Sequence, residues 1–216
     1  MTVGEGDETV EDNSLGRLLA LSDGVFAIAM TLLALDLRLP DIGDDAGAEE
    51  VTAAVGAVLP HLLTFLLSFY VVGNYWRAHH RIMRSVTRTH WRVTRETLAL
   101  LCLVAAMPFP SSLLSEHAGA PISLAVYGVV NVVANGLLLL LRHDVRVFGL
   151  ADEPVDPAAQ QRSTIEMWGN LVVFVLVIPA GYLFGGWGAL VLVLLAVSGR
   201  LGAIVQWFRR APSPVS

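Results

Sequence analysis

Long apolar stretches constrain this chain more than any other feature of its sequence. A helix needs about twenty mainly apolar residues to cross a bilayer, and stretches of this kind recur along the chain with short polar connections between them. Only 15% of the residues are charged, whereas 55% are hydrophobic. We therefore predict an all-α integral membrane protein with six transmembrane helices, at residues 15–39, 51–79, 94–114, 122–141, 165–183 and 187–208.

The charges of the connections predict the orientation of these helices. The second and fourth connections are rich in arginine, whereas the first is rich in acidic residues and the third, around Glu116, has no arginine. In membrane proteins the cytoplasmic loops carry the excess of basic residues. We therefore expect both termini and the even-numbered connections to be cytoplasmic. The arginines on that side are Arg77, Arg81, Arg84, Arg88, Arg92, Arg95, Arg142, Arg146, Arg162, Arg209 and Arg210.

We expect one membrane domain with a polar segment at each end. Acidic residues are frequent in residues 1–14, before the first predicted span, and such a segment is typical of a disordered tail. We expect residues 15–210 to form a single six-helix domain and residues 211–216 to form a short C-terminal tail.

The sequence lacks the motifs of common catalytic and cofactor sites. It has no glycine-rich phosphate loop, no G-x-S-x-G and no H-E-x-x-H. Its single cysteine, Cys102, has no partner in the chain for a disulfide. We therefore expect neither an enzyme nor a resident cofactor or metal, and no nucleic-acid partner. A TVGYG-like filter is also absent, so any ion selectivity would need another device.

The first predicted span carries polar residues on two different faces. On an ideal helix, Thr31, Leu32 and Leu35 lie within about 60° of Ile28, whereas Asp23 lies about 140° away from it. The spacing leaves open whether the Thr31 hydroxyl merely bonds to a carbonyl one turn earlier. Small residues, which let membrane helices approach closely, run beside the Ile28 stripe at Ala20, Gly24, Ala27 and Ala34.

Asp23 and the end of the second span form a second polar group. An ionisable side chain inside a span is costly, and it usually pairs with another group or marks an ion pathway; here the sequence favours a structural role. The first span starts and the second ends on the cytoplasmic side, so Asp23 lies at the depth of Asn74, Trp76, His79 and His80. We expect Asp23 to accept a hydrogen bond from an imidazole or an indole. No further ligand stands at a spacing that predicts a zinc site.

The arginines of the second connection recur at spacings of three and four residues. Arginine-rich helices also serve as voltage sensors. Here, however, the arginines alternate with His, Thr and Ser rather than with an unbroken apolar run. The pattern favours a basic face at the level of the lipid headgroups.

Two prolines interrupt the third span near its outer end. Pro108 and Pro110 stand inside an otherwise apolar stretch. A proline removes one helical hydrogen bond and its ring clashes with the preceding turn. We therefore expect a distorted helix at this point.

Three short motifs occur in the first three spans. Arg17, Leu21, Ser22 and Asp23 precede VFAIAMTLLALDL; YWRAHHR ends the second span, and PFPSSLL ends the third. Together these motifs resemble the transmembrane protein 175 family of potassium channels, in its prokaryotic single-repeat form. The family pattern is R-x-x-x-F-S-D followed by an A-I-A-I-T-L-L run, so Leu21 replaces a Phe and Met30 replaces an Ile.

This resemblance implies a homotetramer in which four copies of the first helix line a central pore. It implies that Ile28, Leu32 and Leu35 form apolar layers of the pore and that Thr31 contributes a hydroxyl. It also implies a polar network that fixes the first helix, formed by Arg17, Ser22, Asp23, Asn74, Trp76, His79 and His80.

Three classes of function remain open on the sequence. The favoured one is a potassium-selective, leak-like cation channel of the cell membrane, with a hydrophobic constriction. The leading alternative is a secondary or proton-coupled transporter that uses Asp23 with His79 and His80. A membrane interaction protein without transport activity is the third.

Overall fold

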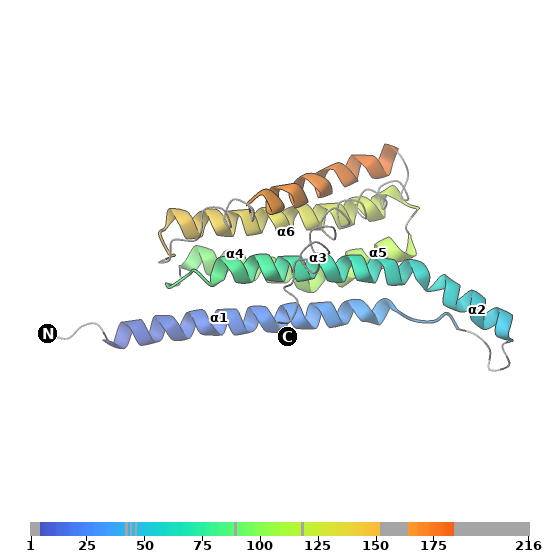
Figure 1. The fold of residues 1–216 in the computed structure, drawn as a ribbon, viewed down its shortest axis with the longest axis horizontal. Helices are drawn as coiled ribbons and strands as arrows, with labels where there is room; N and C mark the ends of the chain where they lie inside the picture. The colour runs from blue at the N-terminus through green and yellow to red at the C-terminus, as the bar shows by residue number, and fades with distance from the viewer. Residues whose placement is uncertain are drawn as a thin grey trace, which may run out of the picture.

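A computed structural model describes residues 5–183 of the chain, except residues 42, 44, 46, 89, 118 and 152–163. This part of the chain is helical and folds as a bundle (Figure 1). The labelled elements are α1 (Glu5–Leu32), the 3₁₀ helix η1 (Leu33–Asp36), α2 (Ala48–Ala57), α3 (Leu59–Met83), α4 (Trp91–Ala106), α5 (Pro108–Glu116) and α6 (Pro121–Val147), followed by a further helix at Thr164–Leu183.

Five helical segments of the described residues are long and apolar enough to cross a membrane. They correspond to the first five predicted spans. The predicted sixth span at residues 187–208 and the tail at 211–216 lie outside the described residues. The five segments are Ser14–Asp36, Ala48–Met83, Trp91–Glu116, Pro121–Val147 and Thr164–Leu183.

Helix α1 extends further toward the N-terminus than the predicted span. It begins at Glu5, whereas the predicted span begins at residue 15; the tail at residues 1–14 stays a prediction.

Prolines divide the second and third spans into two helices each. Helix α4 ends at Ala106 and α5 begins at Pro108, so the predicted distortion at Pro108 is confirmed. Pro60 likewise stands in the first turn of α3, where a proline costs no helical hydrogen bond.

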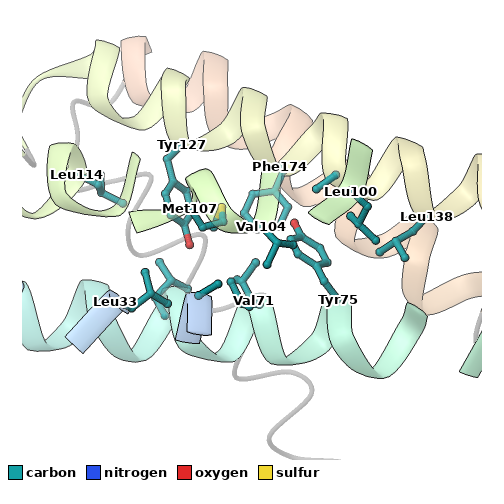
Figure 2. Packing of buried hydrophobic residues seen from close by; sticks show 14 of the residues in the cluster. Leu33, Val71, Tyr75, Leu100, Val104, Met107, Leu114, Tyr127, Leu138 and Phe174 are labelled. Carbon is teal, nitrogen blue, oxygen red and sulfur yellow. The ribbon is translucent and has the colours of Figure 1, made fainter. Parts of the chain in front are cut away.

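Helix α1 lies along one side of the bundle, against α3 and α4 (Figure 1). The helix at Thr164–Leu183, drawn in orange, lies on the opposite side, next to α6. Gly128 of α6 allows these two helices to approach closely, because a Cβ atom there would lie 2.8 Å from Cγ1 of Ile178. Most of the apolar core lies between these two sides, and Figure 2 shows part of it, from Leu33 near α1 to Leu138 of α6.

A buried network of hydrogen bonds crosses this core. The Tyr75 hydroxyl of α3 donates to Oδ1 of Asn131 in α6 over 2.6 Å, and the Asn131 amide donates to the Tyr127 carbonyl over 2.7 Å. The Ser68 hydroxyl lies 2.9 Å from the Ser111 hydroxyl of α5 and 3.2 Å from the Tyr127 hydroxyl. Because lipid offers no competing partners for polar groups, these contacts fix α3, α5 and α6 relative to one another. No motif in the sequence indicates this network.

A candidate pore-lining face on helix α1

Helix α1 and the 3₁₀ helix η1 have one buried and one exposed face. Phe26, Ala29 and Leu33 are buried in the main core, with at most 1% of each residue exposed. Leu18, about two turns closer to the N-terminus than Phe26, is buried in a second apolar cluster. These contacts hold α1 to its own bundle, and they leave the opposite face free.

The opposite face is apolar and exposed. It carries all of the predicted pore residues: Ile28 is 60% exposed, and Thr31, Leu32 and Leu35 are also exposed. Leu35 keeps this position although it lies in η1, because three residues of a 3₁₀ helix complete one turn after Leu32. The predicted small residues Ala20, Gly24, Ala27 and Ala34 lie on the same exposed side.

The Thr31 hydroxyl is oriented by its own helix. It donates a hydrogen bond of 2.7 Å to the Ile28 carbonyl, three residues earlier. The hydrogen bond to a carbonyl one turn earlier, which the sequence left open, is therefore present. Because the hydroxyl proton is committed to this carbonyl, the lone pairs of the exposed oxygen remain available to accept a hydrogen bond or to contact a cation.

Asp23 is bound by the indole of Trp76, as the sequence predicts. Trp76 Nε1 of α3 donates to Asp23 Oδ1 over 2.8 Å. The Trp76 ring stacks on the His80 ring, with centroids 5.5 Å apart and an interplanar angle of 25°. This group joins α1 to α3 at the side of the exposed face.

Among the described residues, Arg17, Ser22 and His79 form no hydrogen bond with Asp23 or Trp76. The Ser22 hydroxyl donates to the Leu18 carbonyl over 2.8 Å, and Arg17 is exposed on the same stripe as Ile28. The buried ring of His79 packs against Phe26, with centroids 6.0 Å apart. Helix geometry is the reason, because Arg17 and Ser22 each point about 100° or more away from Asp23.

Asn74 is half-buried in α3. Among the residues that the structure describes, no hydrogen bond connects it to Asp23 or Trp76. In the same part of the chain, no three His, Cys, Asp or Glu side chains converge as a metal site would require. The absence of a resident metal remains a prediction.

A cluster of charges at the arginine-rich end of the bundle was missed by the sequence analysis. Glu96 of α4 is 3% exposed and lies beside Asp144 of α6, which is also buried. Asp144 lies 4.0 Å from Arg92 Nη1 and 3.1 Å from His143 Nδ1. An acidic residue inside the predicted third span was the available signal, since such residues usually pair.

We predict that Trp76→Phe weakens the attachment of α1. Phenylalanine keeps an aromatic ring beside His80 but removes the donor to Asp23. Hydrogen bonds between membrane helices contribute about 1 kcal/mol, so the midpoint of thermal unfolding in detergent should fall by a few degrees. Trp168→Phe, at an exposed tryptophan of the Thr164–Leu183 helix, is the matched control. Equal midpoints for the two variants would contradict the role of this hydrogen bond.

The comparisons with known proteins agree with this architecture. The family model for the endosomal/lysosomal potassium channel TMEM175 matches residues 17–108. A potassium channel of Streptomyces collinus is 35% identical over 158 residues, which cover 71% of this chain and 75% of the relative. The chain belongs to the TMEM175 family. A potassium channel of Chamaesiphon minutus is 37% identical over 142 residues, which cover 63% of this chain and 68% of that one.

A solved structure extends the TMEM175 similarity to the fold. It is the crystal structure of a lysosomal potassium-selective channel TMEM175 homolog from Chamaesiphon minutus. The two structures superpose with a TM-score of 0.69 and 28% sequence identity, covering 88% of this chain and 97% of the other. All predicted site residues, from Arg17 to His80, lie inside the segment matched by the TMEM175 model.

Proposed function

We propose that this chain is a potassium-selective, leak-like channel of the cell membrane that assembles as a homotetramer with cytoplasmic termini. In this assembly four copies of α1 surround a central pore. The observation that carries the proposal is the exposed apolar face of α1 and η1, formed by Ile28, Thr31, Leu32 and Leu35, in a member of the TMEM175 family. The relatives named above as potassium channels support the choice of ion.

The pore face would act as a hydrophobic constriction. Rings of Ile28, Leu32 and Leu35 offer no hydrogen bonds to water, and narrow apolar rings can gate by dewetting. A permeating ion must lose part of its hydration shell there, which costs less for potassium than for the smaller sodium ion. The Thr31 oxygens would contact the ion through the lone pairs that the bond to the Ile28 carbonyl leaves free.

Asp23 would support the pore without meeting the ion. Its carboxylate accepts the hydrogen bond from Trp76 at the side of α1, about 140° from Ile28. This contact, together with the burial of Phe26, would hold each copy of α1 at a fixed rotation about its axis. The rotation matters because it decides which side chains reach the pore.

The transporter alternative has no support in the comparisons, since the relatives reported above are named as channels. It would require Asp23 to exchange protons with His79 and His80. Asp23 is instead hydrogen-bonded to the Trp76 indole, and the His79 ring is buried against Phe26.

Bilayer recording under bi-ionic conditions tests the proposal. The purified full chain is reconstituted with potassium on one side and sodium on the other. We expect a current whose reversal potential is displaced toward the potassium equilibrium potential. Unlike the flux through a carrier, this current should not saturate as the ion concentration rises. A coupled, saturating flux would favour the transporter, and the absence of current would favour an interaction protein; either result would overturn the proposal.

A further inference from the structure

One face of α4 is exposed along its whole length. Trp91, Arg95, Leu98 and Cys102 follow one another at spacings of four, three and four residues and are all exposed. Residues at these spacings share one side of a helix. Trp91 is 61% exposed and stands at the arginine-rich end of the bundle, so this face begins at the membrane surface and continues toward the bilayer interior.

Arg95 and Arg92 both contact Trp91, but they differ in their other partners. The Arg95 guanidinium lies 4.8 Å from the centre of the Trp91 ring. Arg92 lies over both Trp91 and Phe148 and is 4.0 Å from the Asp144 carboxylate. The charge of Arg95 acts on the buried Glu96, but within the described ranges no carboxylate oxygen lies within 4.0 Å of the Arg95 guanidinium. Its donors are therefore held in place by the indole and remain available to another anion.

The position of Arg95 favours an anion that belongs to the lipid. It lies one helical turn beyond Trp91, where tryptophans mark the membrane interface. A guanidinium binds phosphate oxygens through two parallel hydrogen bonds. Anionic lipids are attracted to basic segments beside the membrane, and further exposed arginines, Arg84 and Arg88, lie in the connection before α4.

We propose that Arg95 and Trp91 form a binding site for the headgroup phosphate of an anionic phospholipid. The Arg95 guanidinium binds the phosphate, and the Trp91 indole orients the guanidinium through the contact with its ring. Leu98 and Cys102 contact the first carbons of an acyl chain. This inference depends on the membrane location of the chain and is independent of potassium conduction.

Tryptophan fluorescence in vesicles tests the site. The full chain is reconstituted in phosphatidylcholine containing either brominated phosphatidylglycerol or brominated phosphatidylcholine, and the signal of Trp91 is taken as the difference between wild type and Trp91→Phe. We expect brominated phosphatidylglycerol to quench Trp91 at about a tenfold lower mole fraction than brominated phosphatidylcholine, since a charge-assisted hydrogen bond contributes about 1.5 kcal/mol.

Three variants test the role of the guanidinium. Arg95→Gln should abolish the preference for phosphatidylglycerol. Arg95→Lys should retain part of it, because lysine keeps the charge but loses the two parallel donors. Arg88→Gln is the matched control, since Arg88 is exposed at the same arginine-rich end, and the guanidinium groups that lie over the Trp91 ring are those of Arg92 and Arg95; it should leave the preference unchanged.

Three results would overturn the proposal. Equal quenching by the two brominated lipids would mean that Trp91 lies at the interface without a specific lipid. The absence of quenching by either lipid would mean that another copy of the chain covers this face. Relief of the quenching by inorganic phosphate would mean that the site binds free phosphate instead of a lipid headgroup.

Discussion

The Ile28→Asn variant is expected to carry a larger unitary current than the wild type and to discriminate less between potassium and sodium. Asparagine is smaller than isoleucine and its amide can form hydrogen bonds with water, so the ring at this level stays hydrated. A barrier lowered by about 1.4 kcal/mol raises the crossing rate about tenfold. We expect a rise of this order in conductance and, in bi-ionic recordings, a reversal potential nearer to zero.

Ile122→Asn is the matched control for this prediction. Ile122 stands at the start of α6 and is 58% exposed, against 60% for Ile28. The same chemical change is therefore made at a residue of equal exposure that lies away from α1. Its conductance and reversal potential should equal those of the wild type. Equal behaviour of Ile28→Asn and wild type would contradict the placement of Ile28 in the pore.

The first five helical spans and the contact between Asp23 and Trp76 could be predicted from the sequence because local rules govern them. Apolar length defines a span, and the charge pattern of the connections brings the start of the first span and the end of the second to one depth. Only a few donors exist at that depth, and Trp76 is one of them. The same helical periodicity separates Ile28 from Asp23.

The contacts inside the bundle could not be predicted in this way. The bond between Tyr75 and Asn131 depends on the relative rotation and register of α3 and α6, which no local pattern encodes. Arg17 and Ser22 point away from Asp23 within one protomer, so their part in the implied network stays a prediction. The charge cluster at Glu96 also depends on tertiary packing, because Asp144 belongs to α6 and lies beside Glu96 only in the folded bundle.

Phe26→Ala is the prediction with the largest expected effect on stability. Phe26 is fully buried at 0% exposure and packs against the His79 ring of α3. Replacing a buried phenylalanine by alanine removes its apolar contacts and leaves a cavity, at a cost of about 3–5 kcal/mol. We expect a large fall in the midpoint of thermal unfolding of the detergent-solubilised protein.

Phe109→Ala provides the matched control, because Phe109 of α5 is 67% exposed and exposed positions usually change stability by less than about 0.5 kcal/mol. Equal destabilisation by the two variants would contradict the packing of α1 on α3.

The two faces of α1 also predict opposite effects on the current. Ile28→Asn removes a barrier from an otherwise intact pore and raises the current, whereas Phe26→Ala loosens the helix that carries the pore face and lowers the number of conducting channels. Recordings of both variants therefore separate the lining of the pore from its support.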